Sequence, residues 1–345
     1  MRVGREILQS EELPCEAKFG GLLPSVKRRN TRWCFAVFCC APYLINPKDE
    51  SGKPLKNREA LKESIRLGVE AEKYIQPFLE APHKLEYEKT FWPFILFSKK
   101  RYIGNKYEFK TGDNDYKETS MGIVLKRRDN AEIVKHVYGG VIDILMNKKN
   151  LEMSIQFLKD ELFKLLDGKF KLDMLVITKS LRGYYKNPDQ IAHKVLADRM
   201  GVRDPGNKPS SNDRIPYVYI EVKEEKGKSI LQGDRIEHPE FIKENKLKPD
   251  YKFYITNQIM KPVGQIYSLI VEDLKGFKFK KDYYQTKYKS LLNTLDETKA
   301  KNKITKLRFE EACEIIFSDV IRVADNRKNK CRTIDNWFKI GVPKP

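Results

Sequence analysis

The chain has 345 residues, which is enough for two or three domains with a sizeable core. Its 67 Lys and Arg residues outnumber 48 Asp and Glu residues, so the formal net charge is +19, and the excess is spread along the chain. Such a basic surface predicts a polyanionic partner, whereas the lack of an apolar run near 18 residues and of a secretory start argues against a membrane.

Residues 1–42 show no clear hydrophobic period, and we assign them no domain. Four of the six cysteines lie there: Cys15, Cys34, Cys39 and Cys40. No pair forms Cys-x-x-Cys, and the four histidines lie far apart, so we expect neither a zinc site nor a disulfide framework.

The pattern changes near residue 43. A turn-rich loop covers 46–54, and an amphipathic helix is expected over 58–79 because its apolar residues recur at helical spacing. The residues of this apolar stripe are Leu61, Ile65, Ile75 and Leu79.

The run Phe91–Phe97 predicts a strand buried on both faces. Gly104-Asn105 predicts a tight turn, with 106–109 returning as the partner strand. Between them stand three adjacent cations and a tyrosine, which are Lys99, Lys100, Arg101 and Tyr102. Adjacent cations repel one another, so a phosphate backbone is the favoured partner, although a solvated basic turn also explains the run.

The remaining chain is mostly helical by pattern. A strand is expected over 122–130, leaving through a second cationic cluster that includes Arg127 and Arg128, and another over 214–222. Helices are expected over 134–146, 151–166, 188–200, 251–271 with an interruption at Pro262, and 309–323.

Lys99-Lys100-Arg101-Tyr102-Ile103-Gly104 resembles the motif with which family B DNA polymerases grip the primer–template duplex behind the active site. Further segments are similar to the C-terminal part of the delta-like members, which large nucleocytoplasmic DNA viruses also carry, and they follow the family's order over roughly 44–271. The segments are 52–68, 85–104, 122–130, 175–179, 203–206, 213–218 and 254–263.

The resemblance implies an α+β fold. Residues 43–125 would be the C-terminal part of the palm, with a helix and antiparallel strands. A mostly helical thumb would cover 126–325, followed by a basic tail over 326–345. The chain would be part of a DNA-directed DNA polymerase in DNA replication, bound to primer–template duplex, with dNTPs as substrates of the full enzyme. The expected location is intracellular, in the host nucleus or a cytoplasmic viral factory.

The same resemblance assigns DNA contacts. Lys99, Lys100, Arg101 and Tyr102 would hold the duplex through phosphates and minor-groove acceptors. Arg127 and Arg128 would make a second backbone contact at the palm–thumb junction. For these two arginines, a salt bridge to Asp129 or a solvated turn remains open.

Family B polymerases hold two Mg²⁺ ions with carboxylates. By resemblance Glu88 is an acid near that metal site, although an ion pair with Lys89 or Lys99 explains it slightly better. The metal ligands themselves stay unassigned, because neither Asp-x-x-Ser-Leu-Tyr-Pro nor Tyr-Gly-Asp-Thr-Asp occurs in the sequence. Where the second motif is expected, 34–40 contains no carboxylate.

We therefore expect this chain alone to be inactive. It would be a truncated or frame-shifted product with residues 1–42 out of frame, or a subunit of a split polymerase. A non-catalytic duplex DNA-binding protein is the alternative function. A restriction-like nuclease using Asp143 with Glu221 and Lys223 is a remote one.

The C-terminal tail resembles the clamp-binding peptide of replication proteins through Ile334, Trp337 and Phe338. Cys331 stands where such peptides carry Gln. A tail that packs on its own domain is the alternative.

Overall fold

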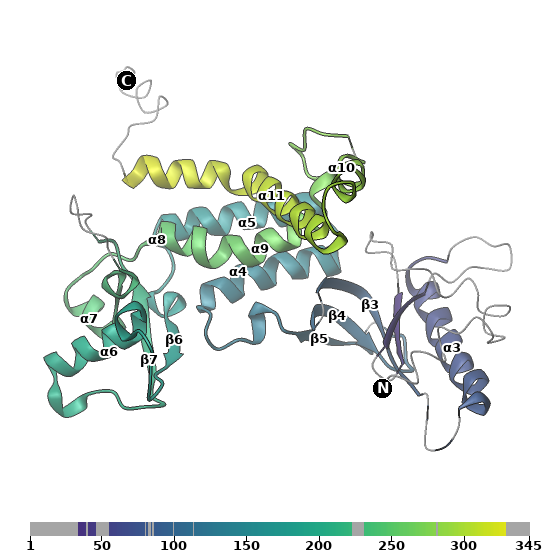
Figure 1. Cartoon of the computed structure of the whole chain (residues 1–345), viewed down its shortest axis with the longest axis horizontal. Helices are drawn as coiled ribbons and strands as arrows, with labels where there is room; N and C mark the ends of the chain where they lie inside the picture. Colours follow the sequence, from purple (N-terminus) through teal and green to yellow (C-terminus); the bar gives the residue numbers. More distant parts are fainter. Residues whose placement is uncertain are drawn as a thin grey trace, which may run out of the picture. The chain divides into compact units, whose positions relative to one another are not determined.

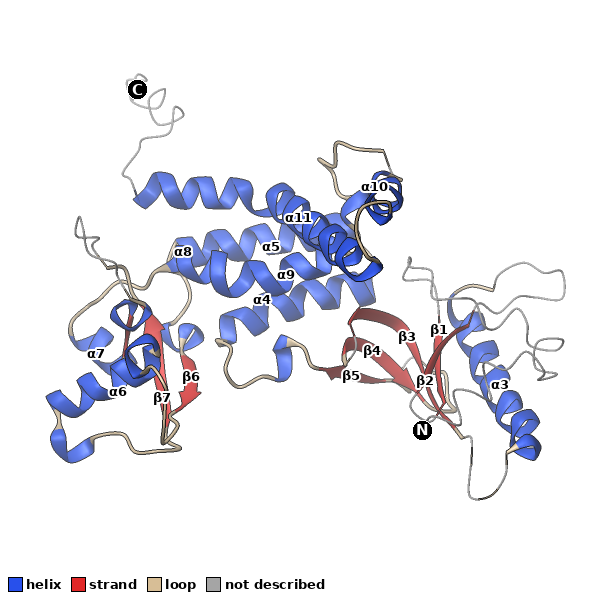
Figure 2. Cartoon of the chain, in the orientation of Figure 1, coloured by secondary structure: helices blue, strands red, loops and turns tan. Residues whose placement is uncertain are grey.

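The computed structural model describes residues 34–38, 41–45, 55–79, 81, 84, 86–98, 100–112, 114–222, 231–280 and 282–328. The chain divides between Lys126 and Arg127 into two compact units, which are described separately. The first is a helix with an antiparallel sheet, and the second is mainly helical with a small antiparallel sheet (Figure 2). The expected α+β class is confirmed. Among the described helices, none combines the length and apolar composition needed to cross a bilayer.

The first unit is a five-stranded antiparallel sheet in the order β2-β1-β3-β4-β5, with α3 (Asn57–Ile75) packed against it (Figure 1). The strands are β1 (Cys34–Phe38), β2 (Ala41–Ile45), β3 (Tyr87–Ser98), β4 (Arg101–Tyr107) and β5 (Lys117–Met121). The expected helix is confirmed, but it ends at Ile75 and not at Leu79, because Gln76–Phe78 forms a 3-10 turn and Leu79 is extended. The core that joins helix and sheet consists of Ala60, Leu61, Ile65, Tyr87 and Tyr107.

The turn predicted at Gly104-Asn105 is wrong, since both residues lie inside β4. The chain turns instead at Lys100, whose φ is 61°. Gly104 faces Phe94 in the strand register, and a Cβ added there would lie 2.7 Å from the Phe94 ring. Glycine is needed here because an aromatic ring approaches the backbone, and the approaching residue comes from the neighbouring strand.

Two further strand predictions are wrong. β3 is not buried on both faces: Ile95 is 9% exposed, but the next residue, Leu96, is 43% exposed. The strand expected over 122–130 is absent from these described residues. The strand β5 ends at Met121, and Gly122 has φ 63°. A Cβ on Gly122 would lie 2.2 Å from the carbonyl oxygen of Lys100, so this glycine allows the chain to pass the β3–β4 turn.

The second unit is organised around α4, α5, α9 and α11, which pack side by side (Figure 1). The predicted helix over 151–166 is confirmed at both ends, and the side chain of Asn150 accepts a hydrogen bond from the Met153 N–H to cap it. The helices are α4 (Glu132–Asp143), α5 (Leu151–Leu166), α6 (Ala192–Arg203), α7 (Pro239–Glu244), α8 (Tyr251–Phe253), α9 (Met260–Ser268), α10 (Tyr283–Leu292) and α11 (Glu297–Lys328).

Helical backbone runs without a break through Pro262, so the predicted interruption is wrong. A π-helical stretch, Tyr254–Ile259, lies directly before α9. Proline lacks an N–H and crowds the preceding turn, and the wider turn of a π-helix accommodates both effects. The helix predicted over 188–200 also begins later, at Ala192, because Ile191 is extended.

A three-stranded antiparallel sheet in the order β6-β7-β8 completes this unit. Its strands are β6 (Ile177–Ser180), β7 (Arg214–Tyr219) and β8 (Ile236–Glu237). Tyr254 ties the sheet to the helices, because its buried Oη donates to the Leu175 carbonyl at 2.6 Å and accepts from the Tyr219 N–H at 3.1 Å.

The last helix, α11, is longer than the predicted 309–323 and starts in a lysine-rich stretch. Arg308 anchors it. Its Nε donates to the Ser268 carbonyl at 2.9 Å, its Nη2 to the Leu269 carbonyl at 3.1 Å, and its Nη1 to Glu272 at 3.2 Å. The side chains of Arg308 and Glu272 are 11% and 7% exposed. This one guanidinium therefore satisfies the C-terminal end of α9 and a buried carboxylate.

Replacing Arg308 with Met is expected to lower the free energy of unfolding of the second unit by about 3–5 kcal/mol, because Glu272 loses its buried cationic partner. The measurement is chemical denaturation followed by circular dichroism. In the double variant Arg308→Met/Glu272→Leu, both charges are removed and part of the loss should be recovered.

Arg322→Met is the matched control, because Arg322 stands on the same helix and pairs with Asp319 at the surface. Its cost should stay within about 1 kcal/mol. Equal costs for Arg308→Met and Arg322→Met would show that the Arg308 network does not stabilise the fold.

Candidate nucleic-acid interface

The β3–β4 hairpin presents the first group of predicted DNA-binding residues. Lys100 occupies the turn and is exposed, and Arg101 and Tyr102 open β4 with half-buried side chains. Lys99 lies outside the described residues. Within the described part of the chain, no carboxylate pairs with Lys100, so its ammonium group is available to an external anion.

An aromatic surface continues from this turn along one face of the sheet. The Tyr102 ring lies 5.5 Å from the Phe94 ring and 5.7 Å from the Phe91 ring, measured between centroids. Tyr102 is opposite Leu96 on one side and Met121 on the other, and these two residues are 43% and 45% exposed. Side chains alternate between faces along a strand, so Tyr107, which packs against α3, belongs to the other face. Phe91 is 2% exposed, so the open apolar part of this face consists of Leu96 and Met121, beside the exposed Lys100.

Other cations of this sheet have partners within the chain. Lys106 donates to Glu108 at 2.6 Å, and this bond holds the pKa of the Glu108 carboxyl below its usual range. Lys89 pairs with Glu88, which is one of the two ion pairs that the sequence left open for that glutamate.

The residues of this structure do not fit the two Mg²⁺ ions that the family's chemistry uses. Glu88 is half exposed and pairs with Lys89, which leaves its carboxylate less available to a metal ion. Over the described ranges, no group of three His, Cys, Asp or Glu side chains is placed to hold a metal ion.

The second predicted contact, Arg127 and Arg128, belongs to the second unit. Arg127 forms a bidentate pair with Asp129, its Nε and Nη2 lying 3.0 and 2.8 Å from the two carboxylate oxygens. This hydrogen-bonded guanidinium lowers the pKa of Asp129, against the opposing effect of burial. The Arg128 side chain is exposed and has no ion pair among the residues described, while its carbonyl accepts a hydrogen bond from the Thr178 Oγ1 at 3.2 Å. Of the two, Arg128 is the better placed to meet a phosphate.

Two of the residues named for the nuclease alternative, Asp143 and Glu221, each interact with a different neighbour. Asp143 lies exposed on α4 and accepts a hydrogen bond from Asn147 at 2.7 Å. Glu221 pairs with Lys248 at 3.0 Å, and Lys223 lies outside the described residues. The clamp-peptide residues Ile334, Trp337 and Phe338 also lie outside the described residues.

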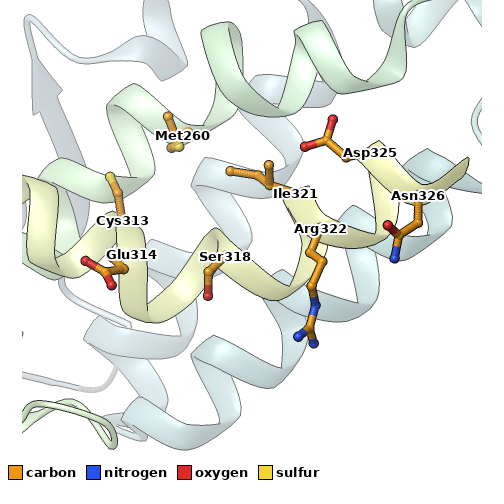
Figure 3. Close-up of a pocket in the computed structure, with 8 residues that line it drawn as sticks. All are labelled: Met260, Cys313, Glu314, Ser318, Ile321, Arg322, Asp325 and Asn326. Atoms are coloured by element: carbon orange, nitrogen blue, oxygen red, sulfur yellow. The ribbon is translucent and has the colours of Figure 1, made fainter. Parts of the chain in front are cut away.

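An open hollow of ≈ 490 Å³ lies between α9 and α11 (Figure 3). Two of its charged groups are paired, Asp325 with Lys252 and Arg322 with Asp319, while Glu314 has no ion pair among the described residues. Burial raises the pKa of the Cys313 thiol there to about 11, so this thiol stays protonated at neutral pH and is a poor nucleophile. The hollow therefore does not resemble a catalytic site.

A further cationic segment was missed in the sequence. Lys179, Arg182 and Lys186 are exposed around Tyr184, and none has an ion-pair partner in the described ranges. The signal available beforehand was the alternation of cations and aromatics in Lys-Ser-Leu-Arg-Gly-Tyr-Tyr-Lys, a composition typical of nucleic-acid contacts.

Comparison with known proteins places this geometry in a family. The family model described as DNA polymerase family B matches residues 56–270. The DNA polymerase of Pyramimonas orientalis virus is 51% identical over 290 residues, which cover 83% of this chain and 24% of that protein. The DNA polymerase of Acanthamoeba polyphaga mimivirus is 41% identical over 314 residues, covering 84% and 18%.

A cellular relative is the DNA polymerase delta catalytic subunit of Caenorhabditis elegans, 33% identical over 216 residues that cover 62% of this chain and 19% of that protein. The chain thus spans about a quarter or less of the length of these curated relatives. The resemblance seen in the sequence is confirmed: this chain belongs to DNA polymerase family B.

Proposed function

We propose that this chain is the part of a DNA-directed DNA polymerase that holds primer–template duplex during DNA replication. The first unit would be the C-terminal part of the palm and the second the thumb. The observation that carries the proposal is the β3–β4 turn, where Lys100 stands exposed and unpaired among the described residues, next to Arg101 and Tyr102.

The chemistry of this hairpin suits a duplex of any sequence. A lysine ammonium and an arginine guanidinium meet phosphates, which carry no sequence information. The Tyr102 hydroxyl can donate to the minor-groove acceptors that every base pair presents. Arg128 would add a backbone contact from the second unit, and Arg127 would add one only when released from Asp129.

The full enzyme would supply Mg²⁺ ions and bind dNTPs through residues that this sequence lacks. Neither aspartate motif of the family occurs in it, so we propose that the chain alone does not polymerise. If the chain is instead a subunit of a split polymerase or a non-catalytic duplex-binding protein, we propose the same contacts with the duplex. The tail with Ile334, Trp337 and Phe338 would bind a sliding clamp, and the site of action would be the host nucleus or a viral factory.

Lys100→Gln is expected to weaken duplex binding by about three- to tenfold near 0.1 M salt, because one phosphate contact is lost. The slope of log affinity against log salt should fall by about 0.9 for that contact. Fluorescence anisotropy with two duplexes of unrelated sequence measures both quantities.

Lys62→Gln is the matched control for this charge change. Lys62 is exposed on α3, which packs on the sheet face opposite Tyr102. It should leave affinity and slope near the parental values. If the two variants bind equally, the β3–β4 turn does not hold the duplex.

Asp129→Asn should free Arg127 and tighten duplex binding at low salt by about two- to fivefold, a small gain because the new contact is solvent-exposed. The control is Asp160→Asn, which removes the same charge from an exposed position on α5. If both variants tighten duplex binding equally, the cause is the change in net charge and not the release of Arg127.

The parental protein offers a pH test of the same pair. Because the Asp129 pKa is lowered in the folded state, the stability from this pair is present above the usual aspartate range and is lost only as pH falls below it. Between pH 6 and 8, Arg127 should therefore remain paired, and duplex affinity should show no step from this group.

A primer-extension assay tests the proposed inactivity. The purified chain, supplied with Mg²⁺ and all four dNTPs, is expected to bind the primer–template and leave the primer unextended. Measurable extension by this chain would overturn the proposal, and binding to the same substrate in the same buffer excludes an inactive preparation.

A further inference from the structure

The segment between β6 and α6 places one tyrosine almost fully in solvent. Tyr184 is 82% exposed, more than any other described aromatic residue. Lys179, Arg182 and Lys186 flank it, all exposed and without an ion-pair partner over the described residues. The charge of Lys179 also acts on Asp129 and helps to lower its pKa, but Asp129 is paired with Arg127, so the cations of this segment can meet an external anion.

The neighbouring Tyr185 holds this segment in place. Its Oη accepts a hydrogen bond from the Arg182 N–H at 2.7 Å and lies 3.0 Å from the His193 Nε2. Since the hydroxyl accepts from Arg182, its own proton can be donated to a neutral His193. Burial lowers the pKa of His193, and the charges of Lys179 and Arg182 lower it further, which favours the neutral ring.

The base of the segment is fixed as well. The Leu181 N–H donates to the Asp213 carbonyl at 2.8 Å, and the Asn212 N–H donates to the Leu181 carbonyl at 2.8 Å. Arg214 adds a further exposed positive charge beside them, with its Nη1 3.2 Å from the Ser180 Oγ. Tyr185 and the strand ends thus hold the backbone on both sides of Tyr184, which keeps its ring directed to solvent.

An exposed ring among unpaired cations matches the way proteins hold unpaired nucleotides. A base can stack on the ring while the cations meet the phosphates on either side. A closed duplex hides its base faces, so the ring would have nothing to stack on. We propose that Tyr184, with Lys179, Arg182 and Lys186, forms a binding site for single-stranded DNA. This site shares no residue with the β3–β4 turn and goes beyond the proposed duplex grip.

The test measures binding of labelled oligothymidine and of a blunt duplex to the full chain by fluorescence anisotropy. Tyr184→Ala should weaken oligothymidine binding by about tenfold, the size expected for one lost base stack. Tyr184→Phe keeps the ring and should bind within about twofold of the parental chain. Duplex affinity should stay unchanged in both variants.

Phe109→Ala is the matched control, because Phe109 is a 68% exposed aromatic residue of the first unit. It should not affect oligothymidine binding. Tyr185→Phe tests the positioning role, since it removes the hydroxyl link between Arg182 and His193 while leaving Tyr184 intact. It should weaken oligothymidine binding without changing duplex affinity.

Two results would overturn the inference. One is equal oligothymidine binding by the Tyr184→Ala and Phe109→Ala variants. The other is an equal loss of duplex and single-strand affinity in Tyr184→Ala, which would make the segment a backbone contact. Loss of duplex binding in Lys100→Gln alone bears on the proposed function and leaves this site untouched.

Discussion

The helical unit depends on one buried guanidinium. The long helix α11 buries an apolar stripe that runs from Ala300 to Ala324, and Arg308 is the charged residue within that stripe. Arg308 adds directed hydrogen bonds to this packing, to two backbone carbonyls at the end of α9 and to the buried carboxylate of Glu272. It also lies over the Tyr284 ring, 5.0 Å from its centroid, and so connects α10 as well. An interior cation is tolerated here because each of its three nitrogens donates a hydrogen bond.

At the surface, a cation that binds an external phosphate must lack a partner within the chain. A phosphate must compete with the carboxylates of the chain itself, so a cation that is already paired binds phosphate more weakly. Lys89, Lys106 and Arg127 are paired in this way. Lys100 and the cations around Tyr184 are not, among the residues described. With 67 basic side chains in the sequence, net charge says only that some anion binds. The pattern of pairing separates the cations held by carboxylates of the chain from those open to an external anion.

The sequence predicted elements well where local pattern and packing agree, as in α5, whose apolar period and Asn150 cap define both ends. The sequence-based prediction failed where a residue distant in the sequence determines the local structure. Gly104 reads locally as a turn, but the Phe94 ring across the strand pair is what demands a glycine. The cations of the family motif lie at the β3–β4 turn, although the turn itself was predicted at Gly104-Asn105, and their contact with DNA stays a prediction. The pairing of Arg127 with Asp129 stayed open until geometry was known, and the segment around Tyr184 was overlooked, because exposure is a property of the folded chain.

The left-handed backbone at Lys100 has a consequence for how this turn balances stability against charge. A residue with a Cβ at φ 61° costs roughly 1 kcal/mol or more relative to glycine. Replacing Lys100 with glycine would relieve the strain in the turn and would also remove the ammonium group. The folded hairpin therefore carries a small standing strain at the point where it presents its charge, and a variant selected only for heat resistance would be drawn toward losing that charge.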